Sequence, residues 1–174
     1  LTRRRRVLGD DHPDTLISVN NLARDLHELG QHEQARRLNE DALIRCRRVL
    51  GDNHPHTLRP AHNLARNLWA LGKYEQARQL DEDTLARRRR VFGDDYPSTL
   101  NSATNLAADL RGLGQHEQAR QLDEDTLARR RRVLGDDHPD TLKSANNLAA
   151  TLRALGRDDE ARELEEWVRS RRCL

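Results

Sequence analysis

The strongest constraint on this chain is a repeat of 42 residues. Two glycine series keep this spacing, at Gly9, Gly51, Gly93 and Gly135 and at Gly30, Gly72, Gly114 and Gly156. A period in this range is typical of stacked repeats, in which each unit buries its apolar face only against its neighbours. We therefore expect a single array over residues 1–174.

Each repeat is predicted to be a pair of antiparallel helices. A proline suited to the first helical position, such as Pro13, precedes apolar residues at helical spacing, and a glycine ends the run. A second amphipathic stretch follows from about His32. The apolar face of the first helix in repeat one is predicted to hold Leu16, Val19, Leu22, Ala23, Leu26 and Leu29.

The repeat boundaries follow from the prolines and glycines. Residues 1–8 match the end of a repeat, so we expect that the chain was cut from a longer array. The four repeats then span 12–50, 54–92, 96–134 and 138–174, the last one truncated. Truncated arrays expose apolar faces, which predicts end-to-end self-association through 1–8 or 160–174, with Trp167 on an exposed end surface.

One residue breaks the pattern of the first helices. Pro60 stands where the other repeats have a serine, and a proline at that point removes the bond to the carbonyl of His56. We expect that this helix either starts late, near Thr57, or kinks at Pro60.

Charge is dense but balanced, with 31 basic and 29 acidic residues. Arginine runs such as Arg87–Arg90 lie at predicted helix ends and have acids four residues before or directly after them. This pattern favours solvated, ion-paired helix ends over a one-sided face for nucleic acid. No apolar run is long enough for a membrane span, and two cysteines are too few for a disulfide framework, which suits the cytoplasm.

Several motifs resemble tetratricopeptide repeats of the kinesin-light-chain type. Repeat one has Asn21-Leu22-Ala23 before Gly30 and Ala35 five residues after it, and Leu-Gly-Asp-Asp-His-Pro at 8–13 recurs at 134–139. The resemblance implies an all-α fold, a right-handed α-solenoid of stacked antiparallel helix pairs. The usual second-helix aromatic is replaced by Asn39, Asp81, Asp123 and Glu165, so the superhelix pitch and groove width can differ.

The resemblance also implies that first helices line a concave groove. The face opposite the leucines carries asparagine and basic residues but no acid, which favours an extended, acidic peptide or protein segment as partner. The alternative is that the asparagines only bridge adjacent helices. The predicted groove residues are Asn20, Asn21, Arg24, His27, Arg59, His62, Asn63, Arg66, Trp69, Asn105, Arg111, Lys143, Asn146, Asn147 and Arg153.

We find no pattern of catalytic residues, phosphate-binding loop or cofactor motif, so the sequence predicts a protein-binding module and not an enzyme. His54, His56 and His62 lie close together but lack a cysteine or acid partner set, and no metal site is expected. The competing hypothesis is a sensor or oligomerisation arm of a larger bacterial signalling ATPase or effector.

Overall fold

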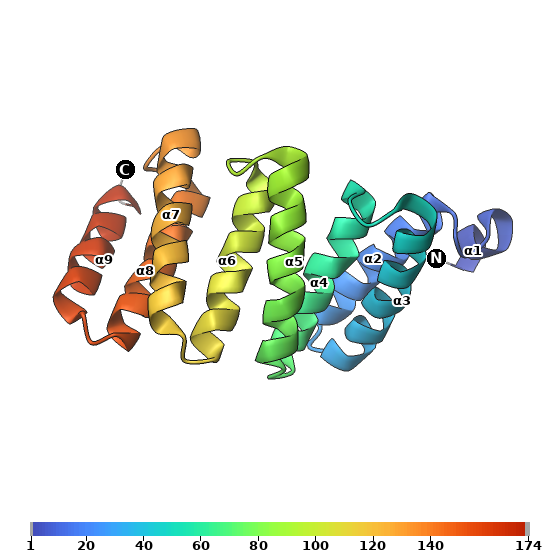
Figure 1. Ribbon diagram of the computed structural model, residues 1–174, viewed down its shortest axis with the longest axis horizontal. Coiled ribbons are helices and arrows are strands. Elements are labelled where there is room, and N and C mark those ends of the chain that lie inside the picture. The colour runs from blue at the N-terminus through green and yellow to red at the C-terminus, as the bar shows by residue number, and fades with distance from the viewer. Residues whose placement is uncertain (1, 173–174) are drawn as a thin grey trace. The chain divides into compact units, whose positions relative to one another are not determined.

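The computed structural model describes residues 2–172 of the chain and consists, over those residues, entirely of helices and short turns. The helices are α1 (Thr2–Leu8), α2 (Pro13–Glu28), α3 (His32–Leu50), α4 (Pro55–Ala70), α5 (Tyr74–Phe92), α6 (Pro97–Gly112), α7 (His116–Leu134), α8 (Pro139–Ala154) and α9 (Asp158–Arg172). Within each unit, the first and second helices of a repeat form antiparallel hairpins, such as α2 with α3 and α6 with α7 (Figure 1). The predicted all-α fold is confirmed.

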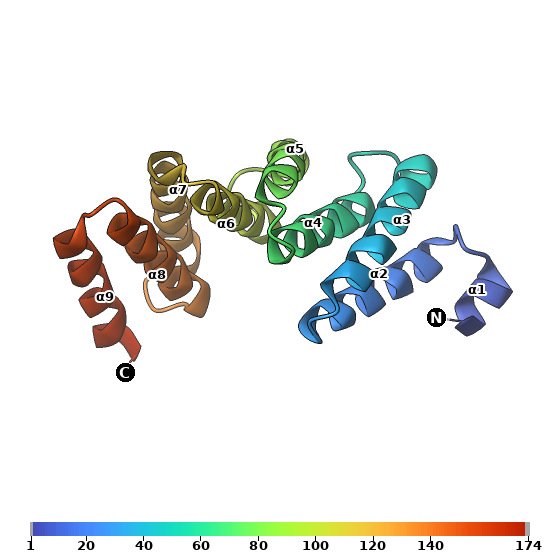
Figure 2. The same cartoon turned by 90° about the horizontal axis from the view of Figure 1, so that it is seen from below.

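The chain divides into two compact units, Leu1–Val91 and Phe92–Leu174. In the first unit α2, α3 and α4 pack on one another and α1 lies against α2. In the second, α6 packs on α7, α7 on α8 and α8 on α9 (Figure 2).

Each first helix begins with the expected proline. The histidine before the proline caps the helix, because its Nδ1 accepts the amide of the second helical residue, as His12 does from Asp14 at 3.2 Å. His54 and His138 make the same bond. Tyr96 holds this position before α6 and makes no side-chain cap; its ring stacks on Phe92 at 4.9 Å instead.

The helix pairs are held together by leucine and alanine. Ala23, Ala35, Ala65 and Ala77 are fully buried, which lets the helices approach closely. Gly30 closes the α2–α3 turn at φ +74°, a conformation that favours glycine. The first unit has a cluster of Leu43, Ala61, Leu64, Leu68 and Ala77. The second has a cluster drawn from α7, α8 and α9, namely Leu127, Leu142, Ala145, Leu148, Ala149, Leu152, Ala161 and Val168.

Two leucines of the predicted apolar face are exposed. Leu22 is 38% and Leu29 72% exposed, whereas Leu64, at the repeat position of Leu22, is buried. The difference at Leu22 arises because the helix before α2 is the short α1, which has no buried residue of its own. Burial at this position therefore depends on the neighbouring repeat and not on the helix alone.

Pro60 does not delay the start of its helix. The prediction of a start near Thr57 is wrong, since α4 begins at Pro55 and continues through Pro60 to Ala70. Pro60 is fully buried against α3 and α2. Its burial between helices accounts for its tolerance, because packing stabilises a helix that has lost one backbone bond.

Trp167 is half-buried and does not form the exposed end surface expected from its repeat position. The guanidinium groups of Arg131 and Arg171 lie over its ring, at 5.0 and 4.9 Å from the centroid. The ring also packs against the core cluster of α7, α8 and α9. A cation beside an aromatic face is favourable, so the two arginines cover what would otherwise be an apolar end.

Candidate protein-binding faces

Five of the predicted groove residues of the first unit lie on α4. His62 and Asn63 lie three and four residues after Arg59, and Arg66 and Trp69 follow Asn63 at steps of three, which places all five on one side of the helix. Asn21 and Arg24 lie exposed on the adjacent α2. We call these seven residues the α2–α4 polar face.

The asparagines of this face are partly committed to holding the two helices together. The side-chain amide of Asn63 donates to Oδ1 of Asn20 at 2.8 Å, and Asn20 is buried. His27 contacts Oδ1 of the buried Asn67 through Nδ1 at 2.7 Å, which joins α2 to α4 a second time. Asn20 and His27 therefore bridge helices, as the alternative interpretation of the asparagines expects.

The cations of the face differ in how freely they can meet a partner. Arg24 and Arg66 are each near an acid, at 3.4 Å from Asp25 and 3.5 Å from Glu28, and both pairs are largely exposed. Exposed pairs of this kind contribute little and exchange readily. Within the described part of the chain no ion pair holds Arg59, which is exposed.

Two further side chains set the character of the face. Trp69 is 44% exposed and meets the edge of Tyr74 at 5.9 Å, so part of a large aromatic surface is open to solvent. Burial, with the nearby charges of Arg88 and Arg66, lowers the pKa of His62 to about 3. His62 is therefore neutral at pH 7, and the positive charge of the face comes from its arginines.

The second unit holds the other predicted groove residues, and both of its groove arginines, Arg111 and Arg153, are already paired with acids. Nη1 of Arg111 donates to Asp123 at 2.7 Å and to Thr151 at 3.1 Å, while Arg153 bonds Glu165 at 2.8 Å. The remaining predicted groove residues here are Asn105, Lys143, Asn146 and Asn147, of which only Lys143 is well exposed. The acids that pair with Arg111 and Arg153 lie on second helices, and no local sequence pattern predicts these contacts.

Asp123 replaces the aromatic residue that is usual in the second helix of such repeats, and the sequence predicted no further role for it. It is buried, and burial raises its pKa above the usual range although Arg111 and Thr151 oppose that shift. Asn39 holds the matching position in the first unit and is also buried. These second-helix polar residues thus pack inside the helix pairs and do not line an open surface.

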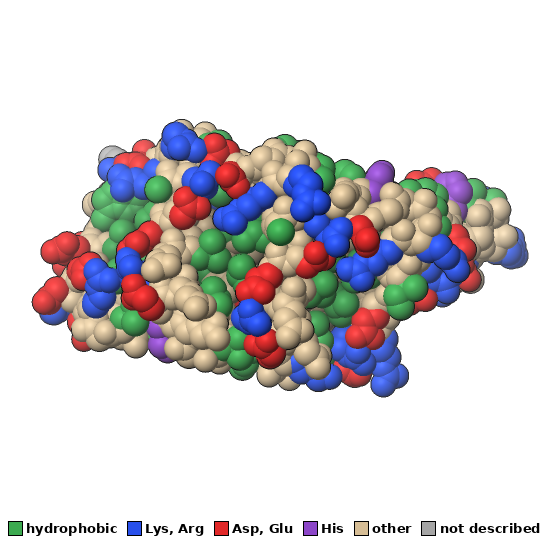
Figure 3. Space-filling model, in the orientation of Figure 1, with side chains coloured by type: hydrophobic (Ala, Val, Ile, Leu, Met, Phe, Trp, Pro, Cys, Tyr) green, Lys and Arg blue, Asp and Glu red, His purple; other side chains and the backbone are tan. Residues whose placement is uncertain are grey.

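The arginine runs are mixed in character: the expected ion pairs form, but not every member of the runs is solvated. The expected bonds from Arg45, Arg87 and Arg129 to the acids four residues earlier are present, at 2.8–2.9 Å. Arg88 and Arg130, however, are buried. Basic and acidic side chains alternate over the face shown in Figure 3, without a continuous basic surface there.

No helix in residues 2–172 combines the length and apolar character needed to span a membrane. His54 and His56 stack at 5.3 Å, and no group of three metal-ligating side chains occurs among the described residues.

Sequence comparison identifies the family. The tetratricopeptide repeat family matches residues 1–43, 17–90, 60–131 and 98–173. This chain is a tetratricopeptide repeat protein. The resemblance inferred from the repeat motifs is confirmed, and so is the expected solenoid architecture of the family. No curated protein sequence matches the chain.

Solved structures give the same assignment. The chain is 32% identical to the nearly identical TPR-like repeats of a kinesin-light-chain-type protein of Podosopora anserina, with a TM-score of 0.85 over 98% of this chain and 80% of that one. BtubC (BKLC) of P. vanneervenii, at 21% identity, has a TM-score of 0.85 over 98% of this chain and 68% of its own. The second likeness supports the fold alone.

Proposed function

We propose that this tetratricopeptide repeat protein binds an extended, acidic segment of a partner protein on its α2–α4 polar face. Proteins of this family are generally protein–protein interaction modules. The observation that carries the finer proposal is the stripe of Arg59, Arg66 and Trp69 along one exposed side of α4.

The chemistry of the stripe favours an acidic, extended partner. Arg59 has no ion pair to lose within the described residues, and Arg66 would exchange a weak contact with Glu28 for a carboxylate of the partner. Half-exposed tryptophan offers a flat apolar anchor beside these charges. The spacing of these groups, about two helical turns from Arg59 to Arg66 and about one from Arg66 to Trp69, suits a strand or loop that runs along the helix.

The face in the second unit is proposed as a weaker contributor. Its arginines already hold Asp123 and Glu165, so an acidic partner would have to displace internal carboxylates. Lys143, Asn105, Asn146 and Asn147 can still supply hydrogen bonds to a peptide backbone. The cytoplasmic location and the arm of a larger signalling protein both stay predictions.

An array of acidic peptides tests the proposal. The Arg59→Ala/Arg66→Ala variant should bind the best wild-type peptide at least about tenfold more weakly, a loss of about 1.4 kcal/mol. Arg37→Ala is the matched control, because Arg37 is an exposed arginine on the second helix α3. Equal binding by the double variant and the control would contradict the proposed face.

The dependence of affinity on salt concentration distinguishes charge-based recognition from non-specific binding. Exposed charges are screened within about 8 Å at physiological ionic strength, so binding should weaken as salt rises. Affinity that is independent of salt, or an equal preference for basic peptides, would contradict an acidic partner.

A further inference from the structure

Adjacent repeats are joined at two places by an arginine that meets a serine. Nη1 of Arg4 on α1 donates to the Asp14 carbonyl at 3.2 Å and to Ser18 Oγ at 2.7 Å on α2. Three repeats later, Nη1 of Arg130 on α7 donates to the Asp140 carbonyl at 3.1 Å and to Ser144 Oγ at 2.7 Å on α8. The same contact therefore recurs where the second helix of one repeat stacks on the first helix of the next.

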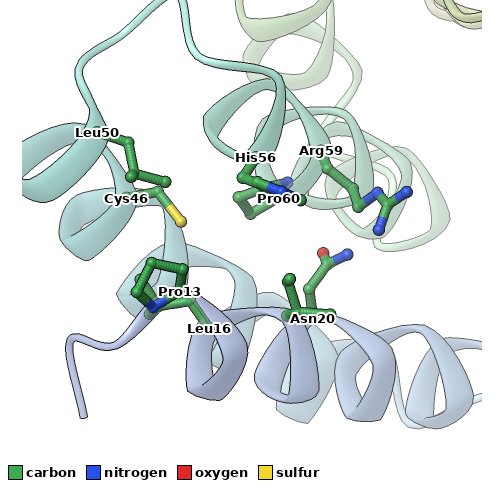
Figure 4. Close-up of a pocket in the computed structure, with 9 residues that line it drawn as sticks. Pro13, Leu16, Asn20, Cys46, Leu50, His56, Arg59 and Pro60 are labelled. Carbon is green, nitrogen blue, oxygen red and sulfur yellow. The ribbon is translucent and has the colours of Figure 1, made fainter. Parts of the chain in front are cut away.

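The joint between α3 and α4 lacks both partners of this contact. Cys46 holds the position of the arginine, and Pro60 holds the position of the serine. Both side chains are buried. Figure 4 shows the Cys46 sulfur pointing into the space beside Pro13, Leu16 and Pro60. The space left over is about 10 Å³, which is room for about one water molecule.

The two replacements explain each other. An arginine at position 46 would bury its guanidinium beside Pro60, which has no hydroxyl to accept a hydrogen bond from it. Of the two acceptors that Arg4 and Arg130 use, only the carbonyl at the matching position, that of His56, would remain. Loss of an acceptor from a buried cation is unfavourable. A serine at position 60 could satisfy its hydroxyl within its own helix, as Ser18 does when it donates to the Asp14 carbonyl at 2.9 Å. Proline at 60 therefore disfavours arginine at 46, whereas serine at 60 tolerates either residue.

We infer that the α4 surface around Pro60 is a selective stacking surface. It accepts a second helix with a small apolar side chain at the joint, as α3 has, and rejects one with an arginine there. The helices α5 and α7 carry that arginine, as Arg88 and Arg130, within the identical stretches 75–91 and 117–133. In a chain of near-identical repeats, a helix can stack on the wrong neighbour. The Cys46–Pro60 joint prevents α4 from stacking on the α5 or α7 helix of a second copy of the chain.

Melting of the full chain tests whether the two positions are coupled. Cys46→Arg is made with Pro60 and again with Pro60→Ser, so the gain from removing a proline cancels within each comparison. Cys46→Arg should lower Tm by at least about 5 °C beside Pro60 and by less than about 2 °C beside serine. Equal shifts in the two backgrounds would overturn the inference.

Cys46→Leu is the control for side-chain size. Leucine has no donor to satisfy, so its effect on Tm should be the same beside Pro60 and beside serine. If Cys46→Leu shows the same dependence on residue 60 as Cys46→Arg, the coupling is one of space and selection against arginine is overturned.

The stacking order is tested by the assembly of the Cys46→Arg/Pro60→Ser chain. Its α3–α4 joint then carries the same residue types as the α1–α2 and α7–α8 joints, so light scattering after refolding should detect more domain-swapped dimer than for the wild-type chain at the same concentration. An unchanged distribution, in a variant that folds, would overturn a role in choosing the neighbour.

Discussion

The side-chain amide of Asn63 on α4 donates to Oδ1 of Asn20 on α2 at 2.8 Å. This bond connects two first helices across a repeat boundary, and Asn63 itself belongs to the α2–α4 polar face. Asn20 and Asn63 thus stabilise the stacking of the helices that carry the proposed binding face. The two asparagines are not equally available to a partner, since Asn20 is buried.

Asn63→Ala should lower the free energy of unfolding of the first unit by about 1–3 kcal/mol, because it leaves the buried Asn20 oxygen without a donor. Urea denaturation followed by circular dichroism measures the change. Asn21→Ala, on the exposed side of α2, is the control and should stay within about 0.5 kcal/mol of wild type. A loss of equal size in both variants would show that the Asn20–Asn63 bond contributes nothing of its own.

Arg130→Met should lower stability by about 2–3 kcal/mol. Methionine keeps much of the side-chain volume but leaves the acceptors on Asp140, Ser144 and Asn101 without their charged donor. The control is Arg132→Met, which removes an exposed arginine that bonds Asp95 at the surface. Thermal melting of the two variants should rank Arg132→Met as the nearly neutral one; the reverse order would refute a structural role for the buried arginine.

Asp123→Asn should destabilise the second unit by about 1–3 kcal/mol. The carboxylate accepts from Arg111 at 2.7 Å and from Thr151 at 2.7 Å, so its replacement leaves the half-buried Arg111 without a counter-charge. Denaturation of Asp123→Asn and of the exposed control Asp158→Asn, compared at pH 7, measures this. Equal stability of Asp123→Asn and wild type would mean that the charge of this carboxylate is not needed.

Acidification should weaken the first unit before surface carboxylates titrate. The pKa of His62 falls from 6.5 to about 3 on folding, so the neutral ring is favoured and its stabilisation, complete above pH 6.5, is lost as pH falls toward 3. Burial also lowers the pKa of His27, which acts in the same direction. Glu33 and Glu75 have pKa values of about 2, held down by Arg36 and Arg78, and lose their contribution only between about pH 4.5 and pH 2.

The measurement is the slope of unfolding free energy against pH between 6.5 and 5. One proton taken up on unfolding corresponds to about 1.4 kcal/mol per pH unit, and His62→Gln should show a shallower slope than wild type. His116→Gln, a histidine of the second unit, serves as the control. Identical slopes for wild type and His62→Gln would mean that His62 is not the group that titrates.

The fold could be predicted from the sequence because a single pattern, repeated four times, fixes the helix pairs and their caps. The errors occurred where a residue's environment comes from another repeat. Leu22 is exposed because of the short α1 before it, and Arg130 is buried because the Asp140 carbonyl and Ser144 of α8 accept hydrogen bonds from it. Pro60 was expected to delay the start of α4 or to kink it, but α4 begins at Pro55 and runs through Pro60, which is buried against residues of α2 and α3.

The residues of the candidate site could be predicted from the sequence, but which of them are free to contact a partner could not. Helical spacing alone places Arg59, Arg66 and Trp69 on one side of α4. It does not reveal that Arg111 and Arg153 are occupied by Asp123 and Glu165, because these acids belong to second helices whose facing side chains no local pattern specifies.

Chemical-shift mapping of the labelled chain with the best acidic peptide tests the central claim most directly. The backbone amides of residues 59–69 and 21–24, together with the Trp69 indole, should shift in proportion to bound peptide, while those on the outer side of α3, around Arg37, stay in place. Shifts confined to α3 and α5, or an absence of shifts at saturating peptide, would contradict binding on the α2–α4 polar face.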